Sequence, residues 1–183
     1  MEVMTMESLG GCCTLDIDRF RSTRDAVEKA PEAGKGSFET VTEWREGAQA
    51  VTRARSFQIE TDEPTPLGGK DQHVDPMELL LAALGSCLTI GWVTQARLRG
   101  IGYRKLVIKV QAPFDLRGYL ALDPSVRPGF GQLRYTVDVD TDADAALLEE
   151  IRIAVERTSP MLDNVLRPTP VEGIVLQRPS VSA

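Results

Sequence analysis

Residues 79–92, LLLAALGSCLTIGW, restrict the possible folds more than any other part of the 183-residue chain. A clear helix start precedes them, since Asp75 suits the N-cap, Pro76 the first helical position and Glu78 the third. Gly100 follows the last apolar residue of the pattern and indicates where the helix ends. The sequence therefore predicts a helix of roughly 24 residues, about 36 Å long. Because its first half is apolar on every side, we expect it to be buried nearly all round, at the centre of a domain or of a dimer.

The segments on either side predict an α+β fold with a mainly antiparallel sheet, because helices and strands do not alternate regularly along the chain. Two alternating runs, 38–44 and 49–60, are separated by Arg45-Glu46-Gly47 and are typical of a β-hairpin. The later elements expected from periodicity are strands over 105–112 and 131–140, a helix over 143–158, a short helix that starts at Ser159-Pro160, and a strand over 171–177.

Residues 1–36 differ from the rest and are expected to form an N-terminal arm with one short helix, ahead of a single domain over 37–183. A chain of this length can bury a core without disulfides, and its three cysteines show no regular spacing. No basic segment precedes an apolar stretch near the start, and the longest apolar run, 79–93, is shorter than the roughly 20 residues of a membrane span. We therefore expect a cytoplasmic protein without a membrane anchor.

Several kinds of site are disfavoured by composition. A net charge of −6 argues against a nucleic-acid surface, which carries clustered Lys and Arg. The single histidine, His73, lies in a polar loop, so neither a His-rich metal site nor a Cys/His zinc site is expected. Residues 68–70, GGK, resemble the end of a phosphate loop, but Pro64 replaces the glycine five residues before Gly69, and Asp71 would repel phosphate. We expect neither a metal nor a cofactor.

Cys87 is the remaining candidate for chemistry. A free cysteine is often a small apolar residue packed between helices, and this structural role is one interpretation. The alternative is a reactive thiol. Its position in the middle of a helix gives it no helix N-terminus nearby, so a reactive thiolate would depend on a neighbouring Arg or Lys.

The run DPMELLLAALGSC at 75–87, a helix ended by glycine and the later SPMLDNVL at 159–166 together resemble the OsmC/Ohr family of hydroperoxide reductases. The resemblance spans about residues 38 to 176. It implies an OsmC-like fold, with mainly antiparallel sheets around a long buried central helix. It also implies an intertwined homodimer, in which two such helices pack at the core and the reactive thiols lie near the interface. A small-molecule peroxide would be the substrate, and a thiol would be the reductant.

The resemblance assigns Cys87 to the thiol that attacks the peroxide oxygen. In this family an Arg from the first hairpin stabilises the thiolate, and Arg45 occupies the matching turn. A solvated turn residue is the plain alternative for Arg45. Arg53 and Arg55 on the next strand are rival candidates for the same role.

The family's Glu at the helix start, which orients that Arg, transfers poorly to this chain. It lies ten residues before the reactive Cys, where this sequence has Met77. Glu78 lies nine residues before Cys87, which at about 100° per residue puts it roughly half a turn away. A capping-box role therefore accounts for Glu78.

The largest departure from the family is at its second cysteine, where this sequence has Ser159. A serine forms no disulfide, so the two-cysteine cycle does not operate within this pair. Ser159 is explained by an N-cap role alone. Cys12 and Cys13, in the N-terminal arm, are an alternative resolving pair or unstructured surface thiols.

Two functions follow from these matches and departures. The first is a one-Cys thiol peroxidase that uses Cys87 and an external thiol reductant. The second is a non-catalytic protein of the same fold that binds a small apolar ligand at the dimer interface. The insertion 113–130 either extends a β-hairpin or shapes such a pocket through four side chains, namely Arg117, Tyr119, Arg127 and Phe130.

Overall fold

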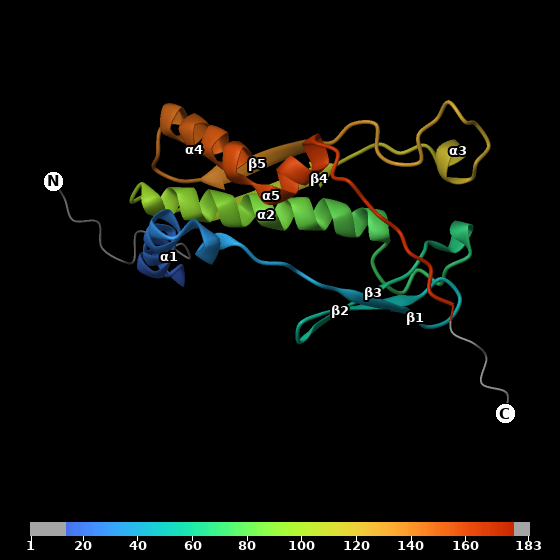
Figure 1. Ribbon diagram of the computed structural model, residues 1–183. Coiled ribbons are helices and arrows are strands. Elements are labelled where there is room, and N and C mark those ends of the chain that lie inside the picture. The colour runs from blue at the N-terminus through green and yellow to red at the C-terminus, as the bar shows by residue number, and fades with distance from the viewer. Residues whose placement is uncertain (1–13, 178–183) are drawn as a thin grey trace.

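The computed structural model describes residues 14–177 and has an α+β architecture built around one long helix, α2 (Pro76–Leu98) (Figure 1). A two-stranded sheet packs along this helix, and a three-stranded sheet lies apart, near the N-terminal end of the helix. All neighbouring strands in both sheets are antiparallel. The predicted fold class, the antiparallel sheets and the long helix are thus confirmed.

Helix α2 begins and ends as its sequence predicts. The Asp75 carboxylate accepts a hydrogen bond from the backbone N–H of Met77 (2.6 Å), and the Glu78 carboxylate accepts one from the backbone N–H of Asp75 (3.2 Å). Together with the bond from Asp75 to the third helical position, these contacts form a capping box. After Leu98 the backbone turns at Gly100, whose φ of 73° lies in the left-handed region that favours glycine.

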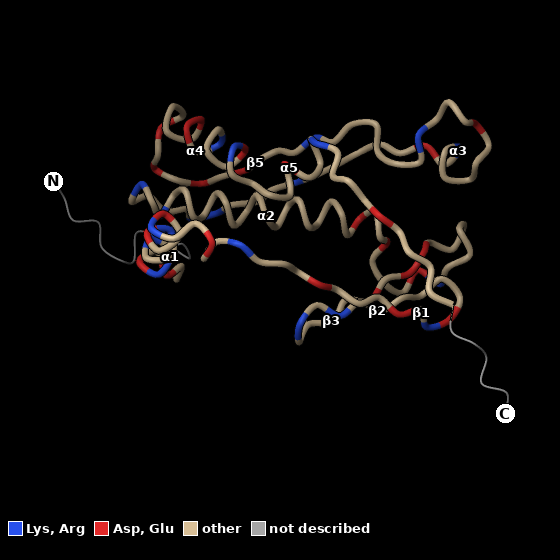
Figure 2. The backbone as a smooth tube through the Cα atoms, in the orientation of Figure 1, with Lys and Arg blue, Asp and Glu red and all other residues tan. Residues whose placement is uncertain are grey.

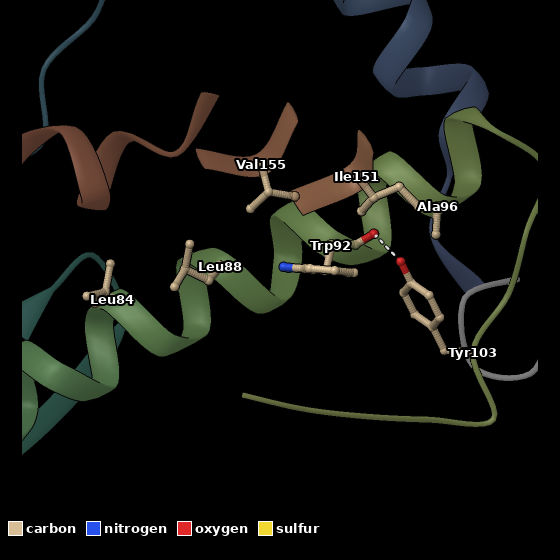
Figure 3. Close-up of a cluster of buried hydrophobic side chains, with 7 residues drawn as sticks. All are labelled: Leu84, Leu88, Trp92, Ala96, Tyr103, Ile151 and Val155. Atoms are coloured by element: carbon tan, nitrogen blue, oxygen red, sulfur yellow. Dashed lines mark hydrogen bonds between the residues drawn. The ribbon is translucent and has the colours of Figure 1, made fainter. Parts of the chain in front are cut away.

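The hydrophobic core forms along one stripe of α2 (Figure 3). The buried α2 residues recur at every fourth position and therefore share one face: Leu84, Leu88, Trp92 and Ala96. Ile151 and Val155 from helix α4 (Ala145–Thr158) cover this stripe. Tyr103 closes one end, where its hydroxyl donates a hydrogen bond to the carbonyl of Trp92 (3.3 Å).

Gly91 allows α4 to approach α2 closely in the middle of this core. A Cβ at this position would lie 3.0 Å from Cγ1 of Val155, which is tighter than ordinary contact. A glycine inside a helix costs about 0.5–1 kcal/mol relative to alanine. The close packing of α2 against α4 offsets that cost.

Most of the remaining surface of α2 is uncovered or only partly covered in the single chain. Ile90 is 65% exposed and Leu80 is 38% exposed, and Figure 2 shows almost no charge between the two ends of the helix. The expectation of burial nearly all round is therefore wrong for one chain, because the elements that pack on α2 reach mainly one side of it. By length and composition alone α2 could cross a membrane, but core helices of soluble proteins meet the same criteria.

The first sheet differs from the predicted hairpin by one extra strand. β1 (Val41–Trp44) pairs with β2 (Ala50–Ala54), which pairs with β3 (Phe57–Thr61). The single run expected over 49–60 is divided by a tight turn in which Arg55 adopts a φ of 58°. Because the alternation continues across this turn, periodicity alone does not reveal the break.

The loop between β3 and α2 is held by a buried carboxylate. Asp62 accepts hydrogen bonds from the backbone N–H groups of Glu63 (2.9 Å), Lys70 (3.2 Å) and Gln72 (3.3 Å), and from the Gln49 side chain (3.3 Å). Burial alone would raise the pKa of Asp62, but these hydrogen bonds outweigh it and lower the pKa. The loop therefore has a defined shape where it enters α2.

The second sheet pairs β4 (Lys105–Gln111) with β5 (Arg134–Asp140), close to the predicted bounds. In both strands partly buried and exposed side chains alternate, and the partly buried apolar face packs against the core of α2. Arg104 fixes one end of the sheet through ion pairs with Asp140 (2.6 Å) and Asp142 (2.7 Å).

Helix α1 (Ile17–Lys29) lies where the charged N-terminal stretch predicts a short helix, and it contacts α2. The remaining short elements are the 3-10 turns η2 (Pro31–Gly34) and η3 (Thr65–Leu67), helix α3 (Leu116–Tyr119) in the insertion, and helix α5 (Pro160–Leu166) directly after α4.

The segment 171–177 does not form the strand that its alternation predicts. It pairs with no strand of residues 14–177, although its chain runs from α5 toward the three-stranded sheet (Figure 1). Its apolar side chains are largely exposed: Val171, Ile174, Val175 and Leu176. A strand forms only where its backbone groups pair with a neighbouring strand, and within residues 14–177 this segment is paired with none.

Candidate active site

Cys87 on α2 lies next to the N-terminus of α5. Its sulfur lies 3.3 Å from the hydroxyl oxygen of Ser159, which is the N-cap of that helix. Cys87 is partly buried and Ser159 is only 6% exposed. The position that holds the second cysteine in the resembled family is thus in contact with the candidate reactive thiol.

The hydrogen bonds of Ser159 leave its proton available to the sulfur. The Ser159 oxygen accepts a hydrogen bond from the backbone N–H of Leu162 (3.2 Å), which uses one of its two lone pairs. The hydroxyl proton can therefore point toward Cys87. By contrast, the neighbouring hydroxyls of Ser86 and Thr158 donate to helix carbonyls, those of Ala83 (3.0 Å) and Ala154 (2.8 Å).

A hollow of about 600 Å³ opens at Cys87. Its walls come from α1, α2, α4 and α5, and include Phe20, Ile90, Val155 and Met161. None of the described residues that line it is charged. The site thus joins a thiol and a buried hydroxyl to a mainly apolar space, which suits a small apolar molecule.

Phe20 was not anticipated as part of this site. It belongs to the N-terminal arm, whose helix has no motif that predicts contact with α2. Only the observed packing of α1 on α2 brings it to the hollow. Cys12 and Cys13, the alternative resolving thiols of the same arm, lie outside the described residues.

The structure does not bring the candidate arginines to Cys87 within one chain. Arg45 lines a separate hollow of about 410 Å³ on the three-stranded sheet, together with His73. Arg53 forms an ion pair with Glu43 (2.6 Å) across β1 and β2, and Arg55 lies over the Phe57 ring (5.1 Å). None of the three lines the Cys87 hollow.

The two residues at the start of α2 also lie away from the thiol. Glu78 completes the capping box, as the sequence predicts. Met77 lines a different hollow, next to α5 and the segment that precedes β5. Neither residue lines the space around Cys87.

The four insertion residues separate into two groups. Arg117 forms ion pairs with Asp115 (2.6 Å) and Asp123 (3.6 Å), and Tyr119 is exposed. Arg127 and the buried Phe130 line the same hollow as Met77. The insertion forms a loop with one short helical turn, so the β-extension considered from sequence is not what the structure shows.

A second polar cluster, which the sequence analysis missed, lies between β5 and α4. Tyr135 donates a hydrogen bond to the Glu156 carboxylate, and Arg152 forms ion pairs with Glu149 and Glu156, each at 2.6 Å. Burial, followed by the contact with Glu156, raises the pKa of Tyr135 to about 12. The four side chains are hydrogen-bond and ion-pair partners of one another, so the cluster is explained as a structural link between β5 and α4. Within residues 14–177 no group of side chains suited to a metal ion was found.

A long capped helix that carries one thiol, flanked by antiparallel sheets and facing the start of a later helix, defines the OsmC-like class of α+β proteins. The family model described as OsmC-like protein matches residues 69–173, more than half of the chain, and the chain belongs to this family.

Solved structures with the same fold come from several bacteria. An OsmC like protein from Mycoplasma pneumoniae is 15% identical, with 72% of this chain and 89% of that chain covered, at a TM-score of 0.63. An organic hydroperoxide resistance protein OsmC from Legionella pneumophila is 14% identical, with 72% and 91% covered, at 0.52. An organic hydroperoxide resistance protein from Elizabethkingia anophelis is 12% identical, with 72% and 89% covered, also at 0.52. No curated protein matches the sequence.

Proposed function

We propose that the chain is a thiol-dependent hydroperoxide reductase in which Cys87 is the reactive thiol. The observation that carries the proposal is the contact of the Cys87 sulfur with the Ser159 hydroxyl (3.3 Å) beside a mainly apolar hollow. Membership of the OsmC-like family supports it, as do structural neighbours named as organic hydroperoxide resistance proteins.

The proposed cycle begins when the Cys87 thiolate attacks one oxygen of an organic hydroperoxide. The O–O bond breaks, the sulfur becomes a sulfenic acid, and the alkoxide takes up a proton and leaves as an alcohol. An external thiol then condenses with the sulfenic acid to give a mixed disulfide and water. A second thiol group attacks the external sulfur, releases the Cys87 thiolate and leaves as the oxidised reductant.

Ser159 supports the first and last steps on this proposal. Its hydroxyl proton donates to the thiolate, and a hydrogen bond to a charged acceptor is stronger than one between neutral groups. The apolar walls suit a substrate with an apolar alkyl group. Because Ser159 forms no disulfide, the reductant must come from outside this pair.

We also propose that the enzyme is a homodimer. The exposed apolar side chains of α2, such as Ile90, leave a surface that a second copy of α2 would cover. The single chain places no cation in the Cys87 hollow among the described residues. A thiolate-stabilising guanidinium would then come from the other copy, and Arg45 of the partner subunit is the candidate that the family resemblance suggests.

The uncharged hollow favours one other function. A thiolate without a nearby cation is poorly stabilised, and the second cysteine of the resembled family is replaced by Ser159. On this second candidate function, the same hollow binds a small apolar molecule and Cys87 does not turn over. The two functions differ in one measurable property, the rate of Cys87 oxidation.

The deciding experiment uses a variant in which Cys12 and Cys13 are both serine, so that Cys87 is the sole thiol. It is treated with cumene hydroperoxide, and the rate of Cys87 oxidation is followed by intact mass and thiol titration. The proposal expects fast, saturable formation of a sulfenic acid, reversed by dithiothreitol, and no reaction in the same variant with Cys87→Ser. A rate equal to that of free cysteine would overturn the peroxidase proposal and leave the binding function.

A further inference from the structure

A hollow of about 690 Å³, larger than the one at Cys87, lies outside the Cys87 site. It is formed by the first half of α2, the segment that leads into β5 and the later residues of α5. The Cys87 hollow instead meets the first two residues of α5, Pro160 and Met161. The two spaces share no lining residue, so the proposed redox cycle makes no use of the larger one.

The walls of this hollow are largely apolar. Its apolar lining residues come from three separate segments and include Met77, Leu84, Phe130, Leu133, Leu162 and Leu166. Phe130 and Leu84 are buried and form firm walls, whereas Leu166 at the edge is exposed. A hollow of this size lies within the usual range of about 300–1,000 Å³ for small-molecule sites.

Two guanidinium side chains belong to the same lining. Arg127 and Arg134 both line the hollow, and neither forms an ion pair within the described part of the chain. The one carboxylate among the lining residues is Glu156, which is already engaged by Arg152 (2.6 Å) and by the Tyr135 hydroxyl. The hollow therefore has an excess of positive charge beside an apolar surface.

The loop that carries Arg127 is built into a defined shape. Gly118 of α3 lies so close to it that a Cβ there would be 2.5 Å from the carbonyl oxygen of Arg127. Arg117 holds the same loop through its ion pairs with Asp115 (2.6 Å) and Asp123 (3.6 Å). Arg117 therefore connects two carboxylates of the segment that precedes Arg127.

We propose that this hollow binds an apolar carboxylate, with the hydrocarbon part against the leucine walls and the carboxylate on Arg127 and Arg134. Guanidinium groups bind carboxylates through charge-assisted hydrogen bonds, often in pairs. Arg127 and Arg134 are exposed, so water solvates them in the empty hollow, and an uncharged apolar molecule would gain no charge-assisted hydrogen bond from them. The site is non-redox, goes beyond the reductase activity, and does not depend on Cys87.

The test is isothermal titration calorimetry of the full chain with decanoate and with 1-decanol, which has the same chain length and no charge. We expect decanoate to bind saturably and about tenfold or more tightly than the alcohol, the difference of one or two charge-assisted hydrogen bonds. The variant with Arg127→Gln and Arg134→Gln should bind decanoate about as weakly as the alcohol. Arg24→Gln on α1, which also removes an exposed guanidinium but outside the hollow, should bind as the wild type does.

Two further measurements separate loss of the charged contacts from misfolding of the double variant, and this proposal from the reductase proposal. Raising the salt concentration should weaken decanoate binding to the wild-type chain and leave 1-decanol binding unchanged, which tests the charge contribution even where the double variant fails to fold. Cys87→Ser should bind decanoate normally, so failure of the reductase proposal does not affect this one. Absence of saturable decanoate binding, or equal affinity for the acid and the alcohol at every salt concentration, would overturn the proposal.

Discussion

Cys87 and Ser159 are 72 residues apart in the chain, and the structure places the sulfur of one 3.3 Å from the hydroxyl oxygen of the other. Two elements fix this contact: α2 carries the thiol, and α4 delivers Ser159 to the N-cap of α5. The two side chains are in contact, and position 159 holds a hydroxyl where the resembled family has its second cysteine. A cysteine at this position is therefore the direct test of a two-cysteine cycle.

Replacing Ser159 by cysteine should create that cycle. After one equivalent of cumene hydroperoxide, Ser159→Cys in the background without Cys12 and Cys13 should lose both free thiols and two mass units. The physical reason is that the sulfenic acid at Cys87 would meet the new thiol in contact distance and condense with it, releasing water. Non-reducing peptide mapping would locate the bond between positions 87 and 159.

Thr158→Cys is the matched control for this experiment. Thr158 lines the same hollow, but its hydroxyl bonds to the carbonyl of Ala154 and not to Cys87. We expect the cysteine at position 158 to form a disulfide with Cys87 much more slowly than the cysteine at position 159 does. Equal disulfide yields from the two variants would contradict the contact between positions 87 and 159.

Removing the hydroxyl with Ser159→Ala should have two separable effects. Loss of the N-cap bond to Leu162 should lower the free energy of unfolding by about 0.5–2 kcal/mol. Loss of the donor to Cys87 should slow alkylation of the thiol by iodoacetamide at neutral pH. Ser159→Thr keeps a capping hydroxyl and should recover most of the stability and of the rate. An alkylation rate unchanged in Ser159→Ala would remove Ser159 from the proposed mechanism.

The parts of the fold that could be predicted from sequence are those fixed by local interactions. Asp75, Glu78 and Gly100 act within a turn of the helix ends, so the bounds of α2 follow from residue type and spacing. The turn at Arg55 is not predictable from sequence, because arginine is not among the residues that favour a positive φ. The strand expected over 171–177 failed for another reason, since its formation depends on a partner edge far away in the sequence or on another chain.

The same distinction applies to the site. Cys87 and Ser159 were identified through the motif positions of a resembled family, and the structure brings them together. The distance of Arg45 from Cys87 depends on how the three-stranded sheet sits relative to α2, which no local sequence pattern encodes. In the single chain Arg45 lines a different hollow from Cys87. Its role remains a prediction about the dimer. Phe20 is in the site because of packing alone.

The core stripe of α2 should be the part of the fold most sensitive to mutation. Leu88 on α2 is fully buried in the core that α2 forms with α4. Leu88→Ala should therefore leave a cavity and lower the free energy of unfolding by about 2–5 kcal/mol. Leu122→Ala, at an exposed position in the insertion, is the control and should change it by less than about 0.5 kcal/mol. Urea denaturation followed by circular dichroism measures both. Similar losses for the two variants would contradict the assigned core.

A pH dependence should arise at the start of α2. Burial, followed by the negative charge of Asp75 and a hydrogen bond to its side chain, raises the pKa of Glu63 above its ordinary 4.5. The folded chain therefore holds this proton more tightly than the unfolded chain does. The stability it contributes is present below pH 4.5 and is lost as the pH rises through the raised pKa.

Glu63→Gln mimics the protonated form and removes this dependence. Its unfolding free energy should match that of the wild type below pH 4.5 and exceed it at neutral pH. Glu39→Gln, at an exposed position before β1, is the control. Its unfolding free energy should change with pH in the same way as that of the wild type. Urea midpoints measured from pH 4 to 8 give the comparison. A Glu63→Gln curve parallel to that of the wild type would show that Glu63 is ionised as easily in the folded as in the unfolded chain.

The exposed side of α2 gives the last prediction, because it decides whether one chain is the functional unit. Ile90 is 65% exposed in the single chain, although it belongs to the most apolar helix of the fold. If a second copy covers this side, Ile90→Glu would bury a charge in an apolar interface and should convert a dimer to a monomer in analytical ultracentrifugation. Leu122→Glu, equally exposed but in the insertion, should leave the dimer intact. A wild-type chain that stays monomeric at every concentration would rule out the homodimer and, with it, a thiolate-stabilising Arg45 from a partner.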